Sequence, residues 1–114
     1  MNKNRDHYYH ADDLRKFSHI GEFGKELADS FFDYYGKVFA EGALTAREKS
    51  LIALAVAHTV QCPYCIDAYA TDATEKGWSE KQMMEAVHVA AAIRSGSSLV
   101  HSVQMMNKVK EISM

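Results

Sequence analysis

The chain contains few of the residues that interrupt helices and none of the patterns that mark strands. One proline occurs in 114 residues, six residues are glycine, and no alternating apolar and polar run of any length is present. The lack of such alternation argues against a fold built on strands. The sequence therefore predicts an all-α fold, a compact bundle of about six helices.

Long apolar runs and an excess of one charge are also missing. The 13 basic and 15 acidic side chains leave a formal net charge of -2, with no basic stripe for nucleic acid. The longest purely apolar run, LIALAVA, is far too short to cross a bilayer. The first ten residues are polar and lack the apolar segment of a secretory signal. We expect a cytoplasmic protein without nucleic-acid or membrane partners, with a polar tail at 1–10 and a single domain at 11–114.

Helical spacing and capping signals predict the individual helices. Capping boxes at Thr45/Glu48 and Ser79/Gln82 mark two helix starts, and Gly77 marks a helix end. The expected helices are 11–20, 21–42, 44–60, 63–76, 79–94 and 99–112, with a Ser-Gly-Ser-Ser break at 95–98 before the last.

The stretch from Leu51 to Val60 is apolar nearly all round. A helix of this kind must be buried on most of its sides. In a domain of this size, such burial suggests neighbouring subunits, so we expect a homo-oligomer.

Two cysteines, the full complement of the chain, form the tetrapeptide Cys62-Pro63-Tyr64-Cys65. In a cytoplasmic protein such a pair indicates redox or metal chemistry rather than a structural crosslink. Glutaredoxins carry the same four letters after a buried strand, but a capped stretch rich in Ala and Leu precedes Cys62. The pair is therefore expected at the N-terminus of a helix, where the dipole and unpaired N–H groups favour a thiolate. Two inert buried cysteines are the simpler alternative.

Two other side chains lie at helical spacing from the cysteines. His58 precedes Cys62 by four residues and, if the helix continues that far, is placed to take the thiol proton. Capping of a helix C-terminus is the alternative for His58. Tyr69 follows Cys65 by four residues, and its hydroxyl can donate to a thiolate or a peroxide oxygen, although packing explains it equally well. The candidate catalytic residues are Cys62, Cys65, His58 and Tyr69.

Residues 43–104, which include the QCPYCIDAY stretch, resemble the alkylhydroperoxidase D-like branch of the carboxymuconolactone decarboxylase family. The family pattern is a glutamate, a C-x-x-C twelve residues later, and a histidine four residues after the second cysteine. The resemblance implies an all-helical trimer or hexamer that acts as a dithiol peroxidase or disulfide reductase without a cofactor. Members that decarboxylate generally lack the cysteine pair, so decarboxylation is not expected. YYHADDL and QCPYCIDAY are most similar to a short subgroup associated with arsenosugar biosynthesis.

The sequence departs from the family pattern at both proton-relay positions. Ser50 stands where the family has glutamate, and Tyr69 stands where it has histidine. The cysteine pair therefore matches the family pattern, whereas the two proton-relay residues do not.

Three functions compete at this point. The leading hypothesis is a dithiol oxidoreductase in which one cysteine attacks a peroxide or a disulfide and the other resolves it to a Cys62–Cys65 disulfide. The resemblance favours Cys65 as the attacker, and the position at the helix start favours Cys62. The alternatives are a soft-metal or metalloid binder, with His58 as a third donor, and a non-catalytic helical oligomer whose site has decayed.

Overall fold

The computed structural model describes residues 10–114, and all regular structure in this range is helical. The elements are the 3-10 helix η1 (Ala11–Phe23) and the α-helices α1 (Lys25–Phe39), α2 (Ala46–Val60), α3 (Pro63–Glu75), α4 (Glu80–Val100) and α5 (Ser102–Ser113). The predicted all-α class and the six helical segments are confirmed for this range. Residues 1–9 of the predicted polar tail lie outside the described residues.

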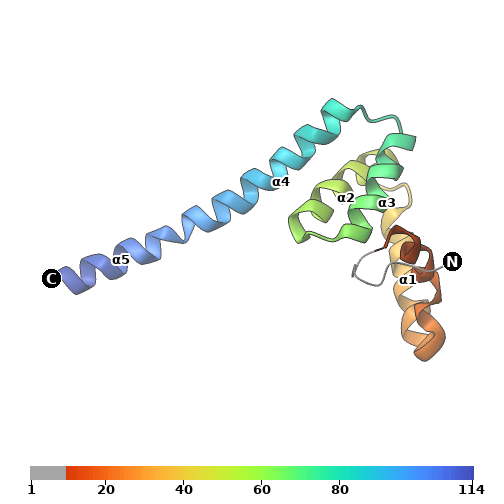
Figure 1. Cartoon of the computed structure of the whole chain (residues 1–114), viewed down its shortest axis with the longest axis horizontal. Helices are drawn as coiled ribbons and strands as arrows, with labels where there is room; N and C mark the ends of the chain where they lie inside the picture. The colour runs from red at the N-terminus through yellow and green to blue at the C-terminus, as the bar shows by residue number, and fades with distance from the viewer. Residues whose placement is uncertain (1–9) are drawn as a thin grey trace.

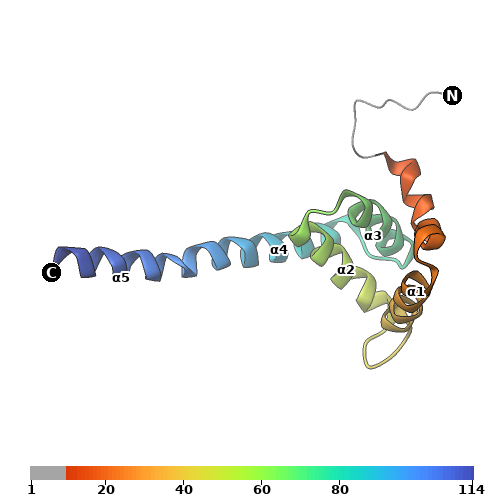
Figure 2. The same ribbon diagram turned by 90° about the horizontal axis from the view of Figure 1, so that it is seen from below.

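The centre of the molecule is a hairpin of α2 and α3, and η1, α1 and α4 pack against it (Figure 1). Helix α2 contacts α1, α3 and α4, while η1 packs on α1 and α3. Helix α4 passes α2 and then leaves this body, and α5 continues in nearly the same direction to the C-terminus (Figure 2). Among the described elements, α5 contacts α4 alone. We call the second half of α4 together with α5 the arm.

The arm makes the isolated chain extended. The radius of gyration is 19.3 Å and the principal extents are 63 × 34 × 32 Å, whereas a compact chain of this length has a radius of gyration of about 13 Å. Large apolar side chains along the arm stay exposed, with Leu99 at 70% and Ile93 at 65%. The predicted compact bundle is thus present in the body from η1 to the start of α4, and the arm lies outside it.

Helix α2 is buried on one side only. Ser50, Leu54 and Ala57 are buried, because α3 and α4 pack on that face. Ile52, Val56 and other apolar residues of the opposite face are about half exposed. The all-round burial expected from the apolar sequence is therefore not reached within one chain.

Both predicted capping boxes are present. The Thr45 amide donates to Glu48 Oε1 at 2.8 Å, and the Glu48 amide donates to Thr45 Oγ1 at 3.0 Å. Ser79 and Gln82 make the same reciprocal pair, at 2.9 and 3.1 Å. These bonds satisfy N–H groups that the first turn of a helix leaves unpaired, and they fix the starts of α2 and α4.

The predicted stop at Gly77 is confirmed. Gly77 has φ +87°, a conformation that glycine adopts without steric cost. Its amide donates to the Thr74 carbonyl at 3.0 Å, and the Trp78 amide donates to the Ala73 carbonyl at 3.1 Å. This bond pattern is a Schellman motif, and it turns the chain from α3 toward α4.

The predicted break at 95–98 is wrong. Helix α4 continues through these residues to Val100, and the helix is interrupted at His101 instead. Serine and glycine lower helix stability by at most about 1 kcal/mol each, and the segment has no proline to remove a hydrogen bond. The helix therefore continues six residues, nearly two turns, beyond the end at 94 that the sequence suggested.

Within residues 10–114, none of the helices combines the length and the apolar character that crossing a bilayer requires.

Candidate functional site

The cysteine pair lies at the start of α3, as predicted. Cys62 is the N-cap residue, Pro63 follows it in the first turn, and Cys65 comes three residues after the cap. Cys62 Sγ accepts a hydrogen bond from the Cys65 amide at 3.2 Å, the position a serine or aspartate oxygen takes in an ordinary N-cap. The two residues form a disulfide, with their Cα atoms 5.2 Å apart. The sulfurs therefore lie at the positive end of the α3 dipole.

The chain reaches Cys62 through a left-handed residue. Helix α2 ends at Val60, and Gln61 has φ 56° and ψ 52°. The Cys62 amide donates to the Ala57 carbonyl at 3.1 Å, which ties the turn back to the last turn of α2. This turn makes α2 and α3 a tight hairpin and fixes where the first cysteine emerges.

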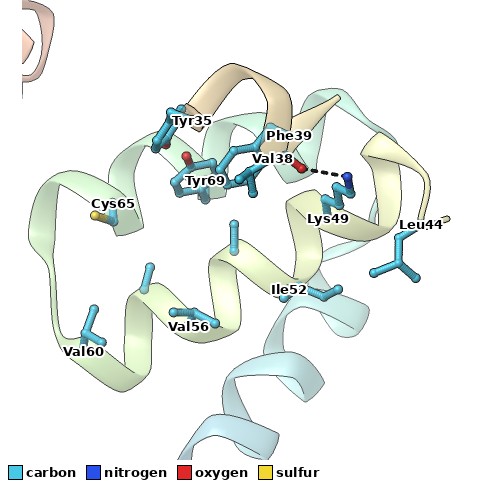
Figure 3. Close-up of a pocket in the computed structure, with 12 residues that line it drawn as sticks. Tyr35, Val38, Phe39, Leu44, Lys49, Ile52, Val56, Val60, Cys65 and Tyr69 are labelled. Atoms are coloured by element: carbon cyan, nitrogen blue, oxygen red, sulfur yellow. Dashed lines mark hydrogen bonds between the residues drawn. The ribbon is translucent and has the colours of Figure 1, made fainter. Parts of the chain in front are cut away.

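Two hollows open beside Cys65. The first, which we call the α1–α2 hollow, has a volume of about 420 Å³ and is walled mainly by apolar side chains (Figure 3). The second, the η1–α3 hollow, has a volume of about 380 Å³ and also includes Cys62 and Tyr64. Of the described residues, Tyr35, Cys65 and Tyr69 line both. Cys65 is thus accessible from two sides, and Cys62 lines only the second hollow.

A stack of aromatic rings forms one wall of the site. The Tyr69 ring stacks on Phe39, with centroids 5.4 Å apart, and Phe39 packs in turn on Tyr35 at 4.9 Å. Phe31 extends the cluster beyond Tyr35, at 5.4 Å. Burial, together with the charge of Asp72, raises the pKa of the Tyr35 phenol above its ordinary value. Tyr35 therefore remains a hydrogen-bond donor throughout the neutral pH range.

Lys49 connects α1 to α2 at the far end of the α1–α2 hollow. Its ammonium donates to the Val38 carbonyl at 2.7 Å (Figure 3) and to the Ala40 carbonyl at 2.6 Å. These carbonyls belong to the C-terminal end of α1, where a cation is favourable. The contact holds the end of α1, which carries Tyr35 and Phe39, against α2.

His58 lies in a different hollow from the sulfurs. Its Nδ1 donates to the Leu54 carbonyl at 2.9 Å, since a carbonyl oxygen can only accept. The ring lines a separate hollow with Gln61, Pro63 and Asp67 among its neighbours, and neither cysteine lines that hollow. The i, i+4 relationship behind the prediction for His58 is absent, because α2 ends before Cys62.

Ser50 belongs to a structural junction. The side chain has no exposed surface, and its hydroxyl donates to the Arg47 carbonyl at 2.6 Å. The Trp78 indole N–H donates to the same carbonyl at 2.8 Å and lies 3.2 Å from Ser50 Oγ. Glu48 is bonded within its capping box. Neither residue supplies a carboxylate to the cysteines.

Comparison with known proteins identifies the family. Residues 25–108 match the model of the carboxymuconolactone decarboxylase family. The chain belongs to this family. A relative from Paracoccus denitrificans, named "Uncharacterized protein 4 in cox locus", is 42% identical over 89 residues, which cover 78% of this chain and 80% of the relative. The crystal structure of a protein from Methanobacterium thermoautotrophicum is similar at a TM-score of 0.71 with 39% identity, over 74% of this chain and 94% of that one.

Membership confirms the resemblance at the level of the family. The carboxymuconolactone decarboxylase family includes alkylhydroperoxidase D-like peroxidases, and this chain has the C-x-x-C pair in a helical fold. The match begins at α1, so η1 lies before it. The η1–α3 hollow over both cysteines is therefore built partly from residues outside the family match, Phe17 and Ile20 among them.

The structure brings together three of the four candidate residues. Cys62, Cys65 and Tyr69 share the η1–α3 hollow, and His58 lies apart from them. Tyr35 was not singled out as a site residue in the sequence, although phenylalanine or tyrosine at 31, 35 and 39 marks one face of its helix. Among residues 10–114, no cluster of three or more His, Cys, Asp or Glu side chains is placed to hold a metal ion.

Proposed function

We propose that this protein is a dithiol oxidoreductase that reduces an apolar peroxide, with Cys62 and Cys65 as its redox pair. The observation that supports this proposal most directly is the disulfide-linked pair at the N-terminus of α3, beside two largely apolar hollows. A Cα separation of 5.2 Å lets the disulfide close without movement of the backbone. The first turn of α3 stabilises the thiolate form that attacks.

The chemistry assigns different roles to the two cysteines. The Cys65 thiolate attacks one peroxide oxygen, the O–O bond breaks, and an alcohol leaves while Cys65 becomes a sulfenic acid. The Cys62 thiol then attacks the Cys65 sulfur, and water leaves as the disulfide forms. Accessibility supports Cys65 as the attacker, because it lines both hollows and Cys62 lines one. A dithiol reductant returns the pair to its reduced form by exchange.

The walls of the hollows favour an organic substrate. Phe39, Val56, Val60 and Phe17 supply apolar surface on either side of Cys65. An apolar group gains free energy when it leaves water for such a surface, and hydrogen peroxide has no such group. Reduction of an organic disulfide by the same pair is the runner-up. Either reaction requires reduced thiols, which fits the cytoplasmic location expected from the sequence.

The protein acts as a homo-oligomer in this proposal, a trimer or a hexamer by family resemblance. Apolar side chains of the arm and the Ile52–Val56 face of α2 are half exposed or more in one chain. A soluble monomer rarely leaves so much contiguous apolar surface in water. A second copy of this chain is the natural partner, because every copy carries both the apolar arm and the apolar Ile52–Val56 face.

The test replaces each cysteine in turn by serine. Serine is a good N-cap residue, so Cys62→Ser retains the start of α3. We expect both variants to fold, and neither to turn over an organic hydroperoxide with a dithiol reductant. In a single exposure to the peroxide, Cys62→Ser forms a sulfenic acid at Cys65, whereas Cys65→Ser reacts far more slowly. Full turnover by either variant would refute the proposal.

A further inference from the structure

We propose that Tyr35 is the proton donor to the oxygen that leaves when Cys65 attacks a peroxide. This inference rests on the proposed function and adds a catalytic residue to it. Tyr35 comes from α1, far in sequence from the cysteines, and stands outside the family's C-x-x-C motif.

The geometry of the two hollows leaves two phenols beside Cys65, and Tyr35 is one of them. The described residues that line both hollows are one thiol and two phenols, Cys65, Tyr35 and Tyr69. Both phenols therefore line each of the two approaches to Cys65. Figure 3 shows the hydroxyl oxygens of Tyr35 and Tyr69 in the same region of the α1–α2 hollow. Phe39 packs against both rings and holds them in place.

The other titratable groups of the hollows are less well placed for this role. The Lys49 ammonium is bonded to the Val38 and Ala40 carbonyls at the end of α1. Lys16 is paired with Asp13 at 2.9 Å in the η1–α3 hollow. Tyr64 lines that hollow as well, but not the α1–α2 hollow. Tyr69 is the remaining phenol, and it can pass a proton to Tyr35 after the reaction.

The chemistry of a phenol suits a donor and not a base. The leaving alkoxide of an alkyl hydroperoxide is strongly basic, and a phenol that is neutral at pH 7 can protonate it. The raised pKa of Tyr35, caused by burial and by Asp72, keeps this proton in place over a wide pH range. Deprotonation of the attacking thiol is then left to the start of α3, since neither Ser50 nor Tyr69, at the two relay positions, is a base.

Atoms, protons and electrons balance in this reaction of Cys65 with a hydroperoxide. The Cys65 thiolate takes one oxygen of ROOH, and RO⁻ leaves with the electron pair of the broken O–O bond. RO⁻ takes the Tyr35 hydroxyl proton and becomes ROH. The proton that Cys65 lost when it ionised returns to Tyr35 through water or Tyr69. The sum is one thiol and one hydroperoxide converted into a sulfenic acid and an alcohol.

The test uses two oxidants whose leaving groups differ in basicity. Cumene hydroperoxide releases an alkoxide that needs a proton, and peracetic acid releases a carboxylate that does not. We expect Tyr35→Phe to slow thiol oxidation by cumene hydroperoxide roughly 10- to 100-fold and to leave oxidation by peracetic acid unchanged. Tyr34→Phe is the matched control, because Tyr34 is the neighbouring residue and is 67% exposed. It should leave both rates within about twofold of the wild type.

Three outcomes overturn the inference. Equal slowing with both oxidants means that Tyr35 only positions the site, and no slowing with either means that it takes no part. In both cases the wild type still reacts with the hydroperoxide, so the proposed function stands. A wild type whose thiols survive cumene hydroperoxide refutes the proposed function, and this inference with it.

Discussion

The indole N–H of Trp78 lies 3.2 Å from the hydroxyl oxygen of Ser50, a side chain with no exposed surface. This contact joins the turn after α3 to the first turns of α2. The Arg47 guanidinium lies 3.6 Å from the centre of the indole ring and donates to the Lys76 carbonyl at 2.9 Å. At the position where the family pattern has its relay glutamate, this chain has Ser50, which lies at the centre of this packed junction.

Ser50→Glu is expected to destabilise the protein and not to improve peroxide reduction. The larger side chain has no room at a position with no exposed surface, and burial of its carboxylate is costly. We expect the free energy of unfolding to fall by about 3 kcal/mol or more, against about 1–2 kcal/mol for Ser50→Ala, which only removes hydrogen bonds. Urea unfolding followed by circular dichroism measures both. A Ser50→Glu variant as stable as the wild type would contradict the structural role of Ser50.

Lys49→Met is expected to loosen α1 from α2. The substitution removes two hydrogen bonds from a charged donor to the Val38 and Ala40 carbonyls. The expected loss in unfolding free energy is about 1.5–3 kcal/mol. Lys37→Met is the matched control, since the Lys37–Asp33 ion pair is exposed and contributes about 0.5 kcal/mol or less. Equal effects of the two substitutions would show that the Lys49 contacts do not hold α1.

Met106→Glu is expected to break the assembly. Met106 is 49% exposed on α5, which contacts only α4 among the described elements. Gln104→Glu introduces the same side chain roughly on the opposite side of the helix, and serves as the control. Sedimentation velocity should show the wild type and Gln104→Glu as oligomers and Met106→Glu as smaller species. A wild type that sediments as a monomer would refute the proposed oligomer.

The raised pKa of Tyr35 predicts a loss of stability in alkali. Below the unfolded-state pKa of about 10, the phenol is neutral in both states and its titration adds no pH dependence. As the pH rises past that value, the unfolded chain loses the proton before the folded protein does, so unfolding is favoured. From about pH 8 to about pH 11, the wild type should therefore lose more stability than Tyr35→Phe, in which the other tyrosines are unchanged. Parallel stability curves would mean that burial and Asp72 do not act on this phenol.

Local sequence signals predicted the parts of the fold that depend on neighbouring residues. The capping boxes at Thr45 and Ser79 and the stop at Gly77 are short-range chemistry, and all three are present. The cysteine pair at a helix start followed from the same reasoning. The Ser-Gly-Ser-Ser segment was misread because weak helix propensity does not end a helix whose hydrogen bonds are all available.

Long-range packing accounts for the features that the sequence did not reveal. Gln61 adopts a left-handed conformation without being glycine, and this turn separates His58 from the cysteines. Tyr35 lies on another helix and shares both hollows with Cys65. The stacking of Phe39 on Tyr69, beside it, joins residues 30 positions apart. The burial of Ser50 depends on Trp78, which follows it by 28 residues. Spacing along one helix cannot indicate such contacts.

The most direct test of the central claim is a thiol titration of the fully reduced wild type, before and after one equivalent of cumene hydroperoxide, with the mass of the product. We expect rapid loss of both thiols and a mass lower by two hydrogen atoms, because Cys62 and Cys65 close into a disulfide. Thiols that remain intact, or a stable product that carries added oxygen, would contradict the claim that this pair is a peroxide-reducing dithiol.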